Sequence, residues 1–303
     1  QWLLTTHRSR FNKPGDYITF SLASFSFFLI LGKDERLRAF HNVCRHRAYT
    51  VTKKTEGSSL VLGCRYHGWS YDTKGSLTKA PQFEDIPGFD KTQNGLFEIH
   101  LKTDRRGFVW VNLSSDTRPQ DFKIRQLGEG AAIVGDKVSR DGCWVSGWEI
   151  QGKFNWKVAA QQTENPNDPN ISPAVEALEA LKKPLGRVFE FRYKNHLALF
   201  PPATVQRTSP SPFWYAITIF PNSATTSTVR CDVFSAQYSN AELFSGRIRA
   251  QIEDEVEAIV WRLQRQWARV CNGAGADVLP GTSSVQQKIM NDLKSHLKLE
   301  RLT

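Results

Sequence analysis

The sequence predicts an α+β protein of two domains, in which a small all-β domain precedes an antiparallel sheet with helices. Three observations lead to this prediction. Residues 1–113 are a series of short runs rich in aromatic and β-branched residues, residues 114–140 are polar and broken like a linker, and residues 141–303 combine strand-like runs with a long amphipathic helix. With 303 residues and 40% hydrophobic content, the chain can bury one large core or two moderate ones.

In the first domain, turns rich in Gly, Asp and Lys separate the strand-like runs. The clearest of these runs are 16–31, 37–43, 59–64 and 107–113. Short runs of β-forming side chains between turn residues are typical of a compact β domain.

The second domain opens with a strand-like run at 143–160 and continues with a short helical pattern at 172–183. Further strand-like runs follow at 197–208, 213–223 and 225–237. Its last element lies within 241–270 and is predicted to be a helix, because apolar residues recur there at three- and four-residue intervals. These residues are Ile248, Ile252, Val256, Ile259, Leu263 and Trp267.

Composition excludes several classes of protein. Lys and Arg exceed Asp and Glu by ten, yet they are scattered, so the sequence does not predict a nucleic-acid-binding protein. No run reaches the roughly 18 apolar residues of a membrane span, and no signal peptide is visible. Because the first residue is Gln1 rather than a methionine, we expect that the natural N-terminus is not included. Five cysteines are few and odd in number, which favours reduced thiols and a cytoplasmic location.

Two cysteine–histidine pairs in the first domain have the spacing of metal ligands. Cys44-x-His46 is followed after seventeen residues by Cys64-x-x-His67, and each pair falls on a tight loop between predicted strands. Zinc binds two thiolates and two imidazoles, but zinc sites more often use C-x-x-C knuckles. The paired C-x-H and C-x-x-H loops are what a Rieske [2Fe-2S] centre requires, with two cysteines on one iron and two histidines on the other.

The segments "NVCRHRAY" and "GCRYHGWSYDTKGSLTKAP" resemble the Rieske domain of Rieske-type non-heme iron oxygenases over residues 38–113. The resemblance is to the oxygenase α-subunit, and most to the branch that oxidises choline and other quaternary amines. It implies a Rieske β-sandwich at 1–113, a linker at 114–140 and a catalytic domain at 141–303. Respiratory Rieske proteins carry an additional cysteine in each cluster loop, and neither loop here has one.

The resemblance also gives expectations for residues around the cluster. Trp69 stands where high-potential relatives usually have a serine, so we expect a lower potential, and Tyr71 is a candidate hydrogen-bond donor to a ligand sulfur. Arg45, Arg47 and Arg65 either surround the cluster with charge that suits an acidic electron donor or bind local carboxylates and carbonyls.

In the second domain, "GKFNWKVAA" at 152–160 resembles the segment that precedes the histidines of a mononuclear iron site. After Ala160, however, no histidine occurs until His196. His196 lies in a strand-like run and is interpreted as a structural residue rather than a ligand. Either the chain has lost this site, or residues that carry the two histidines are missing from the sequence after Ala160. We favour the second interpretation, because the stretch from Lys157 to Phe200 is several dozen residues shorter than the family pattern.

The third ligand of the mononuclear site would be a carboxylate on the last helix. Relatives place an Asp there, often after a Glu and before a Gln, which matches Asp254, Glu253 and Gln264. Helical phase instead favours Glu255, since Asp254 falls nearly opposite the apolar face. Asp254 is the predicted ligand, Glu255 is the alternative, and either side chain could simply be solvated.

The resemblance implies an oxidoreductase, a Rieske non-heme iron monooxygenase or dioxygenase that hydroxylates or N- or O-demethylates a small organic molecule. It implies a [2Fe-2S] cluster, a mononuclear Fe(II), and NAD(P)H oxidised by a ferredoxin or flavin reductase partner. A homotrimer is expected on the same basis. The alternative is a Rieske electron-transfer protein, or a degenerate oxygenase subunit without the mononuclear iron.

Overall fold

The structure is a computed structural model that describes most of the first predicted domain and part of the second. Side chains are described for residues 2–23, 25–104, 107–114, 142–159, 212–235 and 242–272, and the backbone also for 196–199 and 203–207. The predicted helix at 172–183 and nearly all of the predicted linker lie outside these ranges. None of the helices in the described ranges combines the length and hydropathy that a bilayer crossing requires.

The chain divides into two compact units. Of the described residues, the first unit contains those up to 114 together with 142–144 and 234–235, and the second contains the remainder. The predicted boundaries at residues 113 and 140 stay predictions, because the residues between them are largely outside the described ranges.

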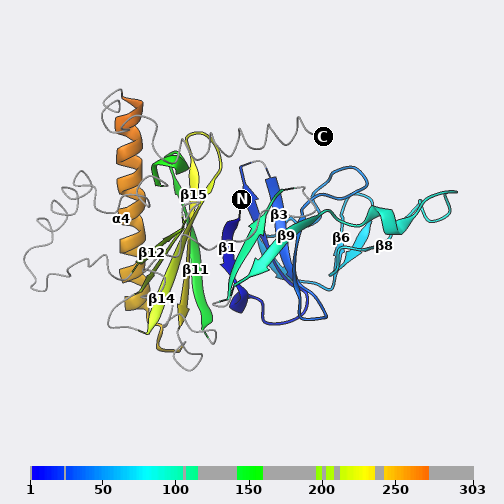
Figure 1. Cartoon of the computed structure of the whole chain (residues 1–303), viewed down its shortest axis with the longest axis horizontal. Coiled ribbons are helices and arrows are strands. Elements are labelled where there is room, and N and C mark those ends of the chain that lie inside the picture. The colour runs from blue at the N-terminus through cyan, green and yellow to red at the C-terminus, as the bar shows by residue number, and fades with distance from the viewer. Residues whose placement is uncertain are drawn as a thin grey trace, which may run out of the picture. The chain divides into compact units, whose positions relative to one another are not determined.

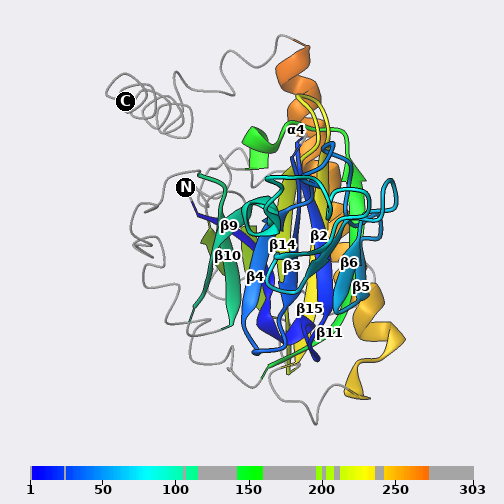
Figure 2. The same ribbon diagram turned by 90° about the vertical axis from the view of Figure 1, so that its right-hand side faces the viewer.

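The first unit is built on a seven-stranded antiparallel sheet in the order β1-β10-β9-β4-β3-β2-β5. Figure 2 shows most of these strands side by side. Their bounds are β1 (Leu3–His7), β2 (Asp16–Leu22), β3 (Phe25–Leu31), β4 (Leu37–His41), β5 (Glu56–Ser58), β9 (Glu98–Thr103) and β10 (Phe108–Asn112).

A second, smaller antiparallel sheet of the first unit has the order β6-β7-β8 and is visible in Figure 1. It consists of β6 (Val61–Gly63), β7 (Ser70–Asp72) and β8 (Leu77–Lys79), and two short 3-10 helices, η1 (Arg8–Arg10) and η2 (Lys91–Asn94), complete the unit. The all-β prediction for this part of the chain is therefore confirmed.

One strand prediction for the first unit needs correction. The run 16–31 is a hairpin of β2 and β3 rather than one element, and the chain turns between Leu22 and Phe25, where Ala23 adopts a φ of 53°. No residue type marks this turn in the sequence, because an alanine at positive φ is uncommon and neither Gly nor Asn occurs there.

A hydrophobic core lies between the large and small sheets of the first unit. The large sheet contributes Phe28, Ile30 and Phe40, and the small sheet contributes Leu62 and Tyr71, all of them buried. Cys44 and Cys64 belong to the same core. The two candidate thiol ligands are therefore enclosed by apolar side chains.

The second unit is a five-stranded sheet in the order β11-β15-β14-β13-β12, with α4 along one face (Figure 1). The elements are β11 (Cys143–Gly152), β12 (His196–Leu199), β13 (Ala203–Arg207), β14 (Phe213–Pro221), β15 (Ser227–Ser235) and α4 (Gly246–Cys271). The α+β class is thus confirmed, and the structure places the predicted C-terminal helix from Gly246 to Cys271. Two predicted runs are corrected: 143–160 is a strand only to Gly152 and is helical at 156–159, and 197–208 is two paired strands, β12 and β13, rather than one.

Helix α4 packs on the sheet through alternate strand residues. Ile252, Val256, Val260 and Leu263 are buried against odd-numbered residues of β14 and β15, as expected for side chains that share one face of a strand. Burying each of these helix side chains stabilises the unit by roughly 1.5–3 kcal/mol. Ser245 caps the helix, since its hydroxyl accepts a hydrogen bond from the Ile248 N–H at 3.4 Å.

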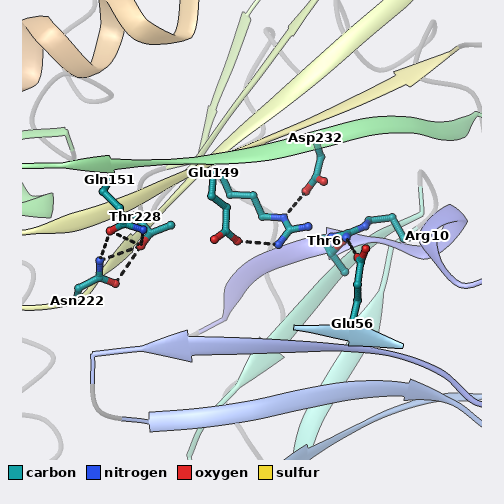
Figure 3. A network of polar contacts seen from close by, with 9 residues as sticks. Thr6, Arg10, Glu56, Glu149, Gln151, Asn222, Thr228 and Asp232 are labelled. Carbon is teal, nitrogen blue, oxygen red and sulfur yellow. Dashed lines mark hydrogen bonds and ion pairs between the residues drawn. The ribbon is translucent and has the colours of Figure 1, made fainter. Parts of the chain in front are cut away.

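Three even-numbered residues of β15, Thr228, Arg230 and Asp232, face away from α4 and are polar. Arg230 bonds Glu149 of β11 at 2.9 Å and Asp232 at 3.0 Å, and nearby Gln151, Asn222 and Thr228 bond one another at 2.8–3.2 Å. Figure 3 shows both groups of contacts. In the first unit, the figure also shows Arg10 with Glu56, 2.9 Å apart.

Candidate metal centre

The first cysteine–histidine pair lies on the connection from β4 to β5. The Cys44 N–H donates to the Tyr49 carbonyl at 2.8 Å, and the Cys44 carbonyl accepts from the Ala48 N–H at 3.0 Å. These two bonds close a tight loop that carries His46 at its tip. Ala48 adopts a φ of 55°, which costs a non-glycine residue about 1 kcal/mol or more.

The second pair lies between β6 and β7 and repeats this backbone pattern. The Cys64 N–H donates to the Trp69 carbonyl at 2.7 Å, and the Cys64 carbonyl accepts from the Gly68 N–H at 2.9 Å. Gly68 has a φ of 75°, at the position that Ala48 occupies in the first loop. The two loops are therefore structural equivalents, although their histidines stand two and three residues after the cysteine.

The structure brings the four predicted ligands together. Cys44 and Cys64 are 2% and 3% exposed, and burial followed by the proximity of Cys44 raises the pKa of the Cys64 thiol. The rings of His46 and His67 lie 4.5 Å apart between centroids, at 72° to each other. Both imidazoles are partly exposed, so the thiols lie in the core and the imidazoles near the surface.

Aromatic side chains fix the orientation of the two imidazoles. The His46 ring stacks on Trp69 at 5.0 Å and meets the edge of Phe83 at 4.9 Å, and the His67 ring lies 4.0 Å from Tyr66. Burial, and then the charges of His67 and Arg47, lower the pKa of His46. These surroundings favour the neutral imidazole, which is the form that binds a metal.

Tyr71 lies beside the sulfur of the first loop. Its hydroxyl is 3.3 Å from Cys44 Sγ and accepts a hydrogen bond from the Arg45 N–H at 3.1 Å. Because the Arg45 N–H donates to the oxygen of this hydroxyl, the hydroxyl hydrogen is free to point at the Cys44 sulfur. Burial raises the pKa of Tyr71, so the hydroxyl keeps this proton.

Sequence reasoning missed Asn42, the residue that closes the first loop. Its Oδ1 accepts from the Val51 N–H at 3.1 Å and the Thr52 N–H at 2.9 Å, and its Nδ2 donates to the Thr52 carbonyl at 2.9 Å and to Ser26 Oγ at 3.1 Å. Asn42 is 3% exposed. One buried amide thus joins both ends of the loop to strand β3. A polar residue two positions before Cys44 was the only signal in the sequence.

The donor set fits a two-iron cluster. A Rieske centre takes two thiolates on one iron and two imidazoles on the other, which matches two buried thiols beside two adjacent imidazoles. In the part of the chain that is described, no three His, Cys, Asp or Glu side chains are arranged to hold one metal ion. A Rieske centre has no need of such an arrangement, since each of its irons has two protein ligands.

In the second unit, the two candidate carboxylates, Asp254 and Glu255, have different surroundings. Asp254 is exposed, whereas Glu255 faces the sheet and accepts from the buried Tyr215 hydroxyl at 2.6 Å and from Gln251 Nε2 at 3.2 Å. Burial, and then Glu255, raise the pKa of Tyr215 well above its usual value. Both oxygens of Glu255 are therefore engaged by neighbours, and Asp254 is the carboxylate with no such contacts.

The segment that resembles the start of the catalytic domain is anchored to α4 and contains a helical turn. Lys153 donates its N–H to Gln264 Oε1 at 2.8 Å, and residues 156–159 are helical after Asn155, whose Oδ1 accepts from the Lys157 N–H at 3.0 Å. No histidine side chain of the second unit is among those described, since only the backbone of His196 is. Of the ligands expected for a mononuclear iron, the described residues thus include the two candidate carboxylates, but no imidazole.

The contacts of Glu255 and Asp254 predict different effects on stability. Replacing Glu255 with alanine should lower the free energy of unfolding by about 2 kcal/mol, because it leaves the buried Tyr215 hydroxyl without its acceptor. Replacing exposed Asp254 with alanine should change it by less than about 0.5 kcal/mol. Urea titrations of both variants measure this difference, and equal losses would contradict the assigned roles.

Comparison with known proteins gives matches in both sequence and fold. Residues 1–90 match the family model described as "Rieske [2Fe-2S] domain". Over 157 residues, the chain is 30% identical to the carnitine monooxygenase oxygenase subunit of Acinetobacter pittii, covering 52% of this chain and 42% of that protein. Over 168 residues, it is 31% identical to the chlorobenzene dioxygenase subunit alpha of a Cupriavidus species, covering 53% of this chain and 36% of that protein. These alignments span about two fifths of each relative.

Solved structures extend the likeness to most of the chain. A quaternary ammonium Rieske monooxygenase in complex with L-carnitine aligns with a TM-score of 0.70 and 21% identity, over 90% of this chain and 78% of that one. Naphthalene 1,2-dioxygenase from a Rhodococcus species aligns with a TM-score of 0.62 and 17% identity, over 77% of this chain and 68% of that one. Both units of the chain therefore share their fold with these proteins.

Proposed function

Because the chain contains a Rieske [2Fe-2S] domain and is homologous to Rieske oxygenase subunits, we propose that it is the oxygenase subunit of such a system. In this proposal it uses O2 and reductase-supplied electrons to hydroxylate, or to N- or O-demethylate, a small organic molecule. The observation that carries the proposal is the pair of equivalent cysteine–histidine loops around two adjacent imidazoles and two buried thiols.

Cys44 and Cys64 would hold one iron of the cluster, and His46 and His67 would hold the other. When bound, the cluster supplies one-electron transfer, at a potential set by its ligands and their hydrogen bonds. The surrounding residues tune and protect it: the core excludes water from the thiolates, and Tyr71 is placed to donate to the Cys44 sulfur. The imidazoles lie near the surface, where electrons enter and leave.

For the mononuclear Fe(II), we propose Asp254 as the carboxylate ligand. Its exposed side chain is free to bind, while the competing Glu255 is held by Tyr215 and Gln251. The residues described do not complete this site, because no imidazole of the second unit is among them. The two histidines would come from the residues that are expected to be missing from the sequence after Ala160.

The remaining partners are proposed from the homologues. Electrons would come from NAD(P)H through a ferredoxin or flavin reductase, and a homotrimer is the expected assembly. All five cysteines lie in described residues and are unpaired, which supports a reducing, cytoplasmic location. The branch that acts on quaternary amines is the favoured source of substrates, a choice that the sequence resemblance and the 30% identity to a carnitine monooxygenase oxygenase subunit support.

Oxygen uptake tests the proposal. The purified chain, supplied with ferrous iron, NAD(P)H and a flavin reductase that contains a [2Fe-2S] domain, is screened against carnitine, γ-butyrobetaine and aromatic hydrocarbons. We expect one compound to give O2 consumption equal to product formation, and a total of three irons per chain. Two irons per chain, with reversible reduction and no product from any compound, would favour the electron-transfer alternative.

A further inference from the structure

Between β8 and η2, the chain makes three successive turns that bring aromatic rings to the first cluster loop. The Phe83 N–H donates to the Ala80 carbonyl at 3.0 Å. The Ile86 N–H donates to the Phe83 carbonyl, and the Phe89 N–H to the Ile86 carbonyl, both at 3.1 Å. Phe83 and Phe89 are partly buried against the core of the first unit, whereas Ile86 is 47% exposed. We call residues 80–91 the aromatic cover.

Phe83 is the residue of the aromatic cover that contacts a cluster ligand. Its ring centroid lies 4.9 Å from that of His46, with 71° between the two planes. Phe83 also packs at nearly right angles on Trp69 at 5.2 Å, and Trp69 is the ring that stacks on His46 at 5.0 Å. The His46 imidazole is therefore bounded by Trp69 over one face and by Phe83 beside it.

Trp69 depends on the same packing for its own position. Its side chain is 2% exposed, and its indole N–H finds no hydrogen-bond partner among the described residues. A buried indole N–H usually has such a partner, so here ring packing rather than a hydrogen bond holds the side chain. Phe83 and Phe89 supply this packing, since both rings lie against Trp69 and 5.5 Å from each other.

One carboxylate joins the two ends of the aromatic cover. Glu84 Oε1 accepts from the Ala80 N–H at 3.3 Å and from Lys91 Nζ at 2.8 Å. The hydrogen bond from Lys91, and then that from Ala80, lower the pKa of Glu84, so the carboxylate is charged at neutral pH. The next residue, Asp85, is also exposed but forms no hydrogen bond or ion pair within the described part of the chain.

We propose that Phe83 is a positioning residue for the Rieske centre, which fixes the plane of the His46 imidazole directly and through Trp69, and that Glu84 holds the aromatic cover closed. An imidazole binds iron in the plane of its ring, so groups that fix this plane strengthen the bond to the metal. The inference deepens the proposed function and rests on it for the cluster itself.

Substitutions in the aromatic cover test this role without substrate or turnover. Phe83→Ala removes the ring, and Phe83→Leu keeps an apolar side chain but presents no ring to His46. Ile86→Ala is the matched control, because it shortens an exposed apolar side chain of the same segment. Each protein is purified with its cluster and reduced with dithionite. Bathophenanthroline then measures the rate of iron release, and pulsed paramagnetic resonance measures the nitrogen couplings of the two imidazoles.

Phe83→Ala should release iron roughly tenfold faster than the wild type, as expected when a group that orients a metal ligand is lost. Phe83→Leu should change the nitrogen couplings of one imidazole, because filling the space does not restore the ring contact. A Phe83 that only filled space would leave these couplings unchanged. Ile86→Ala should match the wild type in both measurements.

The role of Glu84 is tested by a second matched pair. Glu84→Ala should release iron about threefold faster than the wild type, a modest effect because exposed ion pairs contribute little. Asp85→Ala removes the same charge from the neighbouring position and should release iron at the wild-type rate. Equal rates for Glu84→Ala and Asp85→Ala would show that Glu84 does not hold the cover closed.

The proposal is overturned if Phe83→Leu keeps the wild-type nitrogen couplings, or if Ile86→Ala releases iron as fast as Phe83→Ala. Should Phe83→Ala fail to take up a cluster, the couplings of Phe83→Leu decide alone. Failure of the proposed function gives a different result, namely zinc or no labile sulfide in the wild type. A loaded wild-type cluster whose properties no cover variant changes would refute the positioning role alone.

Discussion

Replacing His67 with alanine is expected to abolish the Rieske paramagnetic signal of the reduced protein. The wild type should contain two cluster irons and two acid-labile sulfides, with His46 and His67 on the same iron. Removing one imidazole leaves that iron with a single protein ligand in a loop that opens to solvent. Chemical analysis of iron and sulfide, together with low-temperature spectra of the dithionite-reduced protein, measures the loss.

Two further variants separate loss of a ligand from loss of the fold. His67→Cys offers a thiolate at the same position, so the protein should lose the Rieske spectrum, and any cluster it retains should have a lower potential, because a thiolate adds negative charge. His100→Ala on β9 changes a histidine of the same unit that belongs to neither cluster loop, and it should keep the spectrum. Stoichiometric zinc without labile sulfide in the wild type would refute the cluster assignment, as would a full Rieske signal in His67→Ala.

The second large effect is expected at Asn42. Its alanine variant removes an amide that makes four hydrogen bonds and leaves the Val51 and Thr52 N–H groups without acceptors in a buried position. Each such unsatisfied group costs about 1–3 kcal/mol, so we expect the free energy of unfolding to fall by about 3 kcal/mol or more. The cluster absorbance should bleach at markedly lower urea concentration, because the loop that carries Cys44 and His46 is no longer closed.

Asn94→Ala is the matched control for this variant. Asn94 is in η2, and its side chain donates one hydrogen bond, to the Asp90 carbonyl at 2.8 Å, in an exposed position. Its loss should change the free energy of unfolding by less than about 0.5 kcal/mol. If the clusters of Asn42→Ala and Asn94→Ala lost their absorbance at the same urea concentration as the wild type, Asn42 would not be the residue that closes the first loop.

Much of the fold could be predicted because its signals are local. The helix period of Ile252, Val256 and Leu263 predicted the buried face of α4, since side chains three and four residues apart share one side of a helix. The strand-like runs likewise predicted a β-rich first unit. The hairpin between β2 and β3 was missed, because its turn is made by Ala23 at positive φ and not by a residue that marks turns.

For the candidate site, the predicted ligand types and the chemistry proposed for them follow from local spacing in the sequence. The spacing of Cys44, His46, Cys64 and His67 restricts the metals that fit, since ligand type and number select the cluster. The neighbours that act on these residues are visible only in the folded chain. Asn42 closes its loop through Ser26 and Thr52, which lie sixteen and ten residues away, and Glu255 is occupied by Tyr215, forty residues away. Contacts between such distant residues depend on how strands and helices pack together, and local spacing does not encode this packing.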